Sequence, residues 1–373
     1  MDSSVKYFKI RPRTDQEQLS AALFNYFRRK KIFESDVIDP ELNVQKEAFN
    51  RYIDGCVEKG LLKAETSEKK RGIGFNTSGK RVMGIGFRGD KCFLTLMDLG
   101  GNIIGKENVR IELLLAGDIR NKDIQGIVKA IETRTTLRDS DLACVGIAMP
   151  EEMVKVNPKS MTIFSRGLTQ LMNTRVFVTR SATAAGYGDR EFCPDFLGTN
   201  LLYMYSDVGM GVVLKGEMIF EADEYTEERY SAYLRPWNQY SIVNTTRELV
   251  SRGVGTQIVE MVKGDIDAIT LEVVLCAAEK KDELAEDLVR RSGLALGIRV
   301  AYLVNMFGVK LVIFGGGIEK DEGVFVDSVK KSMSRFLTKE IAKELRMVPG
   351  VLGEVASSIG AAALCRRELF MEV

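Results

Sequence analysis

The chain has 373 residues, of which 45% are hydrophobic and 28% are charged, and its formal net charge is +1. This length and composition are typical of a globular chain with two or three domains, and no apolar run reaches the roughly eighteen residues of a transmembrane helix. The first residues lack the apolar segment of a secretory signal, so we expect a cytoplasmic protein without a membrane partner.

Two further features of the composition narrow the function. The sequence contains no histidine, which excludes histidine-based acid–base catalysis and every zinc site except those made by cysteine and carboxylates. The charge is also uneven, because residues 1–81 contain 17 Lys and Arg against 12 Asp and Glu, a net charge of +5, and the remainder carries −4. A basic N-terminal region on an acidic body favours contact with a polyanion.

The N-terminal region has the pattern of three helices followed by two short strands. The predicted elements are helices over 16–29, 33–42 and 44–59, strands over 61–64 and 72–76, and a charged turn over 65–70. Asn43 is a suitable cap for the third helix, and Gly60 is well placed to end it. This order of elements is typical of a winged helix-turn-helix.

The third predicted helix carries polar side chains on the face opposite its apolar residues. Such side chains read base edges or hold phosphates in a major groove, and a basic wing tip follows the DNA backbone or enters the minor groove. The alternative is a small helical domain with an ordinary solvated face. The expected DNA-binding residues are Gln45, Lys46, Asn50 and Arg51 on the helix and Lys69, Lys70 and Arg71 at the wing tip.

Residues 82–104 open the larger part of the chain with two apolar runs and a third strand. The runs 82–85 and 92–97 flank a turn that is predicted to contain Gly86 and Gly89. Hairpins of this kind bind phosphate when the turn offers backbone N–H groups and a nearby acid holds a metal ion. Gly86 stands where that acid is expected, which indicates a nucleotide site that has lost its metal-binding acid.

The remaining sequence alternates strands and helices and repeats the hairpin. The predicted strands are 142–148, 175–179, 201–206, 212–215, 218–220 and 311–314, and the predicted helices are 116–138, 181–190, 294–307, 323–336 and an amphipathic helix over 360–370. The turn 207–211 echoes the first hairpin, and 221–240 is predicted to be an irregular connection. Two similar halves predict a duplicated α/β protein that binds ligands at the carboxyl ends of its strands, between two lobes.

Taken in order, these motifs resemble the ROK family, which combines sugar kinases of actin-like fold with repressors that carry an N-terminal winged helix. The resemblance covers about residues 16–370. It rests on 45–51 and 60–61 at the recognition helix and its exit, 84–91 at the first phosphate hairpin, 145–150 at a strand ending in proline, 176–185 at the turn with the catalytic acid, 207–211 at the second phosphate turn, 314–317 at the nucleotide-side glycine turn and 359–363 at the final helix.

The resemblance implies an α/β fold class, in which an N-terminal winged helix-turn-helix precedes a duplicated, two-lobed domain of actin/hexokinase-like (ribonuclease H-like) fold. The expected boundaries are 1–79 for the winged helix, 80–186 with the C-terminal 360–373 for the first lobe, and 187–359 for the second lobe with the dimer interface and effector cleft. Because the hairpin follows the wing directly, we expect movement of the first lobe to reach the DNA-binding region.

The departures from the family pattern concern catalysis. Family kinases have Asp at the position of Gly86, Gly-Gly-Thr at 88–90, and a catalytic Asp preceded by Asn where this chain has Ser181 and Arg180. A carboxylate must accept the proton of the sugar hydroxyl, and a serine cannot do so unaided. The family's zinc cluster has no counterpart within 221–238, and Asp90 lies past the turn. We therefore predict an inactive pseudo-kinase with no catalytic residue, metal or cofactor.

The expected effector-binding residues are Arg180, Ser181, Asp207 and Gly209. A guanidinium in the cleft binds anions in a bidentate manner, which favours a phosphorylated or carboxylated effector over a neutral sugar. The alternative is a structural ion pair between Arg180 and an acid such as Asp207. Trp237 either covers the cleft or packs on the surface.

Three functions remain open from the sequence. The first is a homodimeric or homotetrameric regulator that binds a double-stranded DNA operator, represses sugar-metabolism genes and responds to a small-molecule effector. The second is a divergent ATP-dependent sugar kinase with a fused DNA-binding domain. The third is a regulator without a ligand, whose body serves only for dimerisation.

Overall fold

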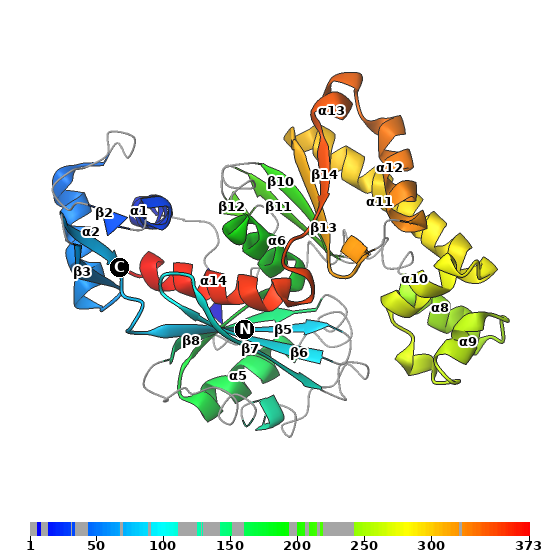
Figure 1. The fold of residues 1–373 in the computed structure, drawn as a ribbon, viewed down its shortest axis with the longest axis horizontal. Coiled ribbons are helices and arrows are strands. Elements are labelled where there is room, and N and C mark those ends of the chain that lie inside the picture. The colour runs from blue at the N-terminus through cyan, green and yellow to red at the C-terminus, as the bar shows by residue number, and fades with distance from the viewer. Residues whose placement is uncertain are drawn as a thin grey trace.

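The structure, a computed structural model, describes residues 6–8, 14–30, 32–33, 44–67, 70–88, 91–110, 125–127, 129, 142–150, 160–193, 200–205, 209–214, 217–218, 242–320 and 323–373. Its strands form three sheets. We call residues 14–75 the head, and we name the first and second lobes after the six-stranded and five-stranded sheets. The head and the second lobe lie at opposite ends of the molecule, with the first lobe between them (Figure 1).

The head contains two described helices and a small antiparallel sheet. The helices are α1 (Asp15–Lys30) and α2 (Lys46–Glu58), and the sheet has the order β2 (Ile32–Phe33), β4 (Lys70–Phe75), β3 (Leu62–Ser67). Helix α2 begins two residues later than predicted, and Gln45 is its N-cap without a side-chain capping bond. The predicted cap Asn43 lies outside the described residues.

Two predictions for the head are wrong in detail. Phe33 pairs with Ile73 in the sheet, so it is not part of a helix over 33–42; the rest of that predicted helix, 34–42, lies outside the described residues. Ser67 pairs with Lys70, so the strands extend almost to the tip and replace the predicted turn over 65–70. The backbone N–H and C=O groups of this charged segment form cross-strand hydrogen bonds, so the charged composition does not prevent a strand.

The first lobe is built on a six-stranded sheet. Its order is β1 (Lys6–Tyr7), β9 (Arg175–Arg180), β8 (Leu142–Met149), β5 (Arg81–Arg88), β6 (Lys91–Asp98), β7 (Ile103–Arg110). The first four are parallel, and β5, β6 and β7 form an antiparallel meander. Strand β1 belongs to this sheet and not to the head, contrary to the expected boundary 1–79, because it pairs with β9 and Phe8 stacks on Phe177.

The second lobe repeats this arrangement. Its sheet has the order β12 (Glu217–Met218), β11 (Gly209–Leu214), β10 (Leu201–Tyr205), β13 (Leu311–Gly315), β14 (Arg346–Pro349). In both sheets an antiparallel meander of three strands pairs, through its first strand, with two later parallel strands. The shared strand order confirms the predicted duplication.

Helices cover the outer parts of the second lobe. They are α8 (Ile242–Ser251), α9 (Gln257–Met261), α10 (Leu271–Glu279), α11 (Glu283–Phe307), α12 (Val324–Phe336) and α13 (Lys339–Glu344), with short 3-10 helices at Ile266–Ala268, Ile318–Lys320 and Gly353–Val355. Asp282 caps α11 by accepting a hydrogen bond from the amide of Ala285 at 2.9 Å, and α11 ends at Gly308 in the left-handed conformation. No helix in the described residues is long and apolar enough to cross a membrane.

The helices of the first lobe lie on both faces of its sheet. Helix α5 (Ser160–Met172), which the sequence did not predict, packs Phe164 and Leu168 on one face. Helices α6 (Ser181–Phe192) and α14 (Ala356–Met371) cover the other face, and α6 also contacts β10 and β11 of the second lobe. Of the helix predicted over 116–138, only 125–127 and 129 are described, and these are helical.

Helix α14 is buried on all sides, so the prediction of an amphipathic terminal helix is wrong. Every residue from Ala356 to Met371 is buried, including Arg366, Arg367 and Glu368. The helix packs against β5, β8, α6 and α1, and Figure 1 shows it between α6 and the six-stranded sheet. Its charged residues therefore belong to the interior, where they require partners.

Gly86 lies within a strand, so its predicted place in the hairpin turn is wrong. It pairs with Phe93 on one side and Ala148 on the other. A Cβ atom at this position would lie 2.7 Å from the backbone nitrogen of Ser358 in α14. The absent side chain therefore permits the close approach of α14 to the sheet.

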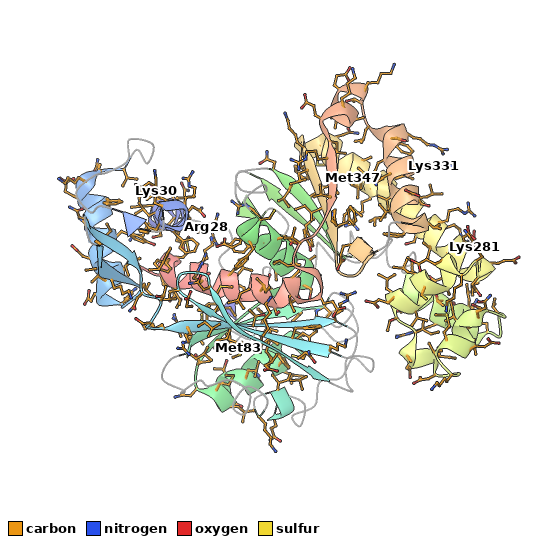
Figure 2. The ribbon with its side chains drawn as sticks, viewed as in Figure 1. Arg28, Lys30, Met83, Lys281, Lys331 and Met347 are labelled. Carbon is orange, nitrogen blue, oxygen red and sulfur yellow. The ribbon has the colours of Figure 1, made fainter. Side chains whose placement is uncertain are left out.

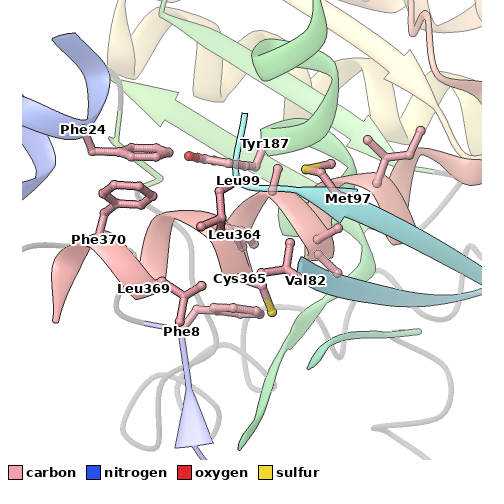
Figure 3. Packing of buried hydrophobic residues seen from close by; sticks show 14 of the residues in the cluster. Phe8, Phe24, Val82, Met97, Leu99, Tyr187, Leu364, Cys365, Leu369 and Phe370 are labelled. Atoms are coloured by element: carbon pink, nitrogen blue, oxygen red, sulfur yellow. The ribbon is translucent and has the colours of Figure 1, made fainter. Parts of the chain in front are cut away.

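The largest core is continuous from the head to the second lobe. It includes Phe24 and Phe75 of the head, Phe370 of α14, and Tyr203 of β10. Figure 3 shows part of this packing, with the rings of Phe24 and Phe370 facing each other. The head is therefore joined to the body by apolar packing as well as by the chain connection.

Candidate functional site

The exposed face of α2 is the first candidate site. Helix α2 buries Phe49, Tyr52, Ile53 and Cys56, which orients Lys46, Asn50 and Arg51 toward solvent. Gln45 is also exposed, at the N-cap. The cations Lys46 and Arg51 lie in the N-terminal half of α2, which also exposes Glu47, and the C-terminal half carries the exposed acids Asp54 and Glu58. A helix of this kind can present its N-terminal half to a polyanion.

The wing supplies the other predicted DNA-binding residues. Lys70 and Arg71 are the first residues of β4, opposite Ser67 and Thr66. Their backbone therefore lies next to the tip of the hairpin, while Lys69 lies outside the described residues. This basic segment therefore lies at the end of the strand pair formed by β3 and β4 of the head.

The second candidate site lies at the start of α6, where the sequence analysis expects the effector cleft. Strand β9 ends at Arg180, which is the N-cap of α6, and Ser181 is the first residue of the helix. The Ser181 hydroxyl donates a hydrogen bond to the carbonyl of Ala148 at 3.2 Å, and its side chain is fully buried. Arg180 is 5% exposed. This end of β9 therefore carries a guanidinium and an engaged hydroxyl, but no carboxylate from either of these two positions.

Other residues predicted for the cleft are described only in part. Gly209 is the first residue of β11 and pairs with Tyr205. Asp207, Trp237, Asp90 and the segment 221–238 lie outside the described residues. Within the described residues, no group of three or more Cys, Asp or Glu side chains could hold a metal ion.

A contact between the lobes involves residues that the sequence analysis did not identify. Arg88, at the end of β5, pairs with Glu272 of α10 in the second lobe, and its second nitrogen lies 3.9 Å from Glu354. A Cβ atom at Gly317, after β13, would lie 2.5 Å from this guanidinium. Burial raises the pKa of Glu272, but the charge and hydrogen bonds of Arg88 outweigh burial and hold that pKa below its usual value. The sequence signal that could have identified this contact is Arg88 itself, which stands where family kinases have glycine.

Asp189 connects α6 to the segment that enters α14. Its carboxylate accepts hydrogen bonds from the amides of Val351 at 2.9 Å and Leu352 at 3.0 Å. Burial raises the pKa of this carboxyl above its ordinary value, although hydrogen bonds from Tyr203 and the two amides oppose the shift. Asp189 was not predicted, because the two amides that bond to it are more than 150 residues away in the sequence.

Comparison with known proteins finds similarity to transcriptional regulators and to a sugar kinase. Residues 252–368 match the sequence profile of the ROK family. Over 349 residues, the chain is 20% identical to the DNA-binding transcriptional dual regulator NagC of Escherichia coli K12. This alignment covers 84% of the chain and 83% of NagC. Matches of the same extent in other E. coli strains are named N-acetylglucosamine repressor.

Solved structures share the fold. A ROK family transcriptional regulator, a homologue of the E. coli Mlc protein, aligns with a TM-score of 0.68 at 15% identity and covers 95% of this chain and 97% of its own. A ROK family glucokinase from Streptomyces griseus, in complex with glucose and AMPPNP, aligns with a TM-score of 0.56 at 18% identity. This alignment covers 76% of the present chain and 98% of the glucokinase. The duplicated strand order agrees with these similarities in fold, and the profile match assigns residues 252–368 to the ROK family.

Proposed function

We propose that the protein is a DNA-binding transcriptional regulator that represses genes of sugar metabolism in response to a small molecule and has no kinase activity. The observation that carries the proposal is the head, whose α2 exposes Lys46, Asn50 and Arg51 above a buried apolar face. Similarity to NagC and to a ROK regulator over most of the chain supports it. In this proposal, α2 is the recognition helix and β3 and β4 form the wing of a winged helix-turn-helix.

DNA binding is tested by selecting genomic fragments that the protein retains and measuring affinity for the best one at several salt concentrations. We expect Lys46→Ala combined with Arg51→Ala to lower the affinity by about two orders of magnitude, because each base or phosphate contact contributes about 1–3 kcal/mol. The salt dependence should also become shallower by roughly one for each lost phosphate contact. Fluorescence anisotropy measures both quantities.

A charge-matched variant controls for the loss of two cations. Lys331 and Arg335 are exposed on α12 of the second lobe, where Figure 2 shows Lys331 pointing away from the body. Lys331→Ala combined with Arg335→Ala should leave the DNA affinity within about twofold. Unchanged binding by the Lys46 and Arg51 variant would place the DNA surface elsewhere.

The effector site of the proposal is the cleft at Arg180, Ser181, Asp207 and Gly209. Arg180 at the carboxyl end of β9 supports an effector with a phosphate or carboxylate, since its planar guanidinium binds such groups in a bidentate manner. The similarity to a named N-acetylglucosamine repressor supports a sugar as the remainder of the molecule. A thermal-shift screen of sugars, sugar phosphates and sugar acids tests this, because a ligand of the folded state raises its apparent stability.

Absence of kinase activity is the next prediction. We expect no sugar-dependent ATP turnover by the wild-type protein, because the Ser181 hydroxyl cannot act as the general base and already donates to Ala148. A coupled assay with Mg-ATP and a panel of sugars measures turnover. The second candidate function, a divergent sugar kinase, is favoured by the similarity to the glucokinase. Turnover that Ser181→Asp does not enhance would mean that the active site lies elsewhere.

Dimerisation is the last part of the proposal, and α11 supports it. Ile298, Tyr302 and Met306 repeat at four-residue spacing and are 43%, 64% and 51% exposed. Four-residue spacing aligns them on one side of the helix, and such a stripe is suited to a second copy of the chain. We expect Tyr302→Glu to shift the sedimentation of the protein from dimer to monomer at micromolar concentration, whereas Lys331→Glu should not.

A further inference from the structure

Glu191 lies where the head, α6 and α14 meet. It is in the last turn of α6, and its side chain is 4% exposed. One carboxylate oxygen pairs with Arg28 of α1, and the other pairs with Arg366 of α14. The side chains of Arg28 and Arg366 are 12% and 2% exposed, so the three charges form an enclosed triad.

The head encloses Arg366 from the other side. The guanidinium carbon of Arg366 lies 5.3 Å from the ring centroid of Phe24 on α1 and 5.8 Å from that of Phe75 on β4. These are cation–π distances. Figure 3 shows Tyr187 of α6 beside the rings of Phe24 and Phe370 at this joint. Arg366 therefore contacts two aromatic rings of the head as well as the carboxylate of Glu191.

The triad makes the joint sensitive to the position of Glu191. Burial lowers the pKa of Arg28 and of Arg366 to about 10, which reflects the cost of enclosing two cations. The nearby Arg190 adds like charge at Arg28. Because the carboxylate of Glu191 lies between the two guanidinium groups, its displacement leaves buried cations without their shared partner. Figure 2 shows Arg28 on the side of α1 that faces the body.

The other end of α6 lies at the candidate effector cleft. The helix starts directly after Arg180, and its residues from Ser181 to Arg190 are all buried. A Cβ atom at Gly360 of α14 would collide with the carbonyl of Ala184, so the two helix backbones are in close contact. A helix of twelve residues spans about 18 Å and moves as a unit when it is tightly packed.

We propose that Glu191 is a positioning residue that couples the effector cleft to the DNA-binding head. A shift at the Arg180 end of α6 moves Glu191, and through Arg28 and Arg366 it changes how the head is held against α14. The inference rests on the proposed function, since it describes how the same cleft and the same head communicate. It assigns this coupling to α6 and α14 and not to the hairpin that follows the wing.

The test compares Glu191→Gln with Asp189→Asn in the full-length chain. Both changes neutralise a buried acid at the end of α6 without changing its shape, but Asp189 accepts hydrogen bonds from Val351 and Leu352, away from the head. Hydrogen exchange is measured without DNA. We expect Glu191→Gln to raise exchange in α1 and the last turns of α14 by about tenfold, and Asp189→Asn to leave α1 unchanged. Equal effects of the two variants on α1 would overturn the inference.

A double-mutant cycle separates coupling from a merely structural role. Arg180→Gln perturbs the cleft end of α6, and we expect it to change the exchange of α1 in the wild-type background but not in the Glu191→Gln background. Additive effects would overturn the inference. If Glu191→Gln does not fold, Arg28→Gln replaces it in the cycle, because this change breaks only the contact with the head.

DNA affinity distinguishes this inference from the proposed function. The probe is the genomic fragment selected with the wild-type protein, and we expect Glu191→Gln to change its affinity by about tenfold or more. If the wild-type protein retains no fragment while exchange follows the predicted pattern, the proposed function fails and the mechanical link stands. If the wild-type protein binds DNA and Glu191→Gln changes neither exchange nor affinity, the link fails and the proposed function stands.

Discussion

Replacement of Gly86 by aspartate, the residue that ROK kinases carry at this position, is expected to destabilise the protein by about 3 kcal/mol or more and not to create a metal site. A Cβ atom there would lie 2.7 Å from the backbone nitrogen of Ser358 and would also meet the hydroxyl of Ser357. The aspartate side chain would collide with the backbone of α14, which cannot be moved easily by a substituted side chain because α14 also packs against α6 and α1. The added carboxylate would also be buried.

Chemical denaturation of Gly86→Asp and Gly105→Asp measures this effect. Gly105 lies in β7 of the same sheet, and a Cβ atom there would have no neighbour closer than 4.0 Å. We expect Gly105→Asp to change the free energy of unfolding by about 1 kcal/mol at most. A Gly86→Asp protein with wild-type stability would mean that α14 does not approach β5 as closely as the structure shows. The close approach of α14 to β5 is therefore the structural reason for a glycine at position 86.

The body of the fold could be predicted from the sequence because its signals are local. Strand β8 is an uninterrupted apolar run, as expected for a parallel strand with both faces covered, and the two meanders repeat the same order of strands and glycines. Predicted strand and helix positions in this region were therefore mostly confirmed. Strand β1 has only two residues and carries no comparable signal, and the first turn of α5 contains no acidic residue that marks its start.

Helix α14 shows where local reasoning fails. Its Arg366, Arg367 and Glu368 gave the sequence an amphipathic pattern, since charged residues are rarely buried without partners. The partner of Arg366 is Glu191, 175 residues earlier, and the aromatic faces that cover it come from the head. No spacing rule relates such distant positions, so the interior location of this helix could only be found in the structure.

The candidate sites could also be predicted only where the signal in the sequence is local. Lys46, Asn50 and Arg51 follow from helical periodicity, and the structure places them on the exposed face of α2. The pair formed by Arg88 and Glu272 joins residues 184 positions apart, and Asp189 bonds to amides more than 150 positions away. Contacts between lobes depend on tertiary packing, and a single sequence contains no pattern that reports them.

Phe370→Ala is expected to destabilise the head and the first lobe together, by about 3–5 kcal/mol. Phe370 is fully buried, and its ring centroid lies 5.2 Å from that of Phe24 and 5.4 Å from that of Phe75. Its carbonyl accepts a hydrogen bond from the Tyr52 hydroxyl at 2.9 Å, and this bond can survive the substitution. The loss therefore comes from the cavity between the head and α14.

Hydrogen exchange during denaturant titration resolves which parts lose stability. Because one core includes Phe24, Phe75 and Phe370, we expect Phe370→Ala to lower protection in α1, α2 and α14 by the same free energy. The control is Leu171→Ala on α5, whose side chain is 48% exposed and whose change should stay within about 0.5 kcal/mol. If α14 lost protection while α1 and α2 kept theirs, the head would be an independently stable domain. A shared loss would instead mean that any signal reaching α14 changes the energy with which the head is held.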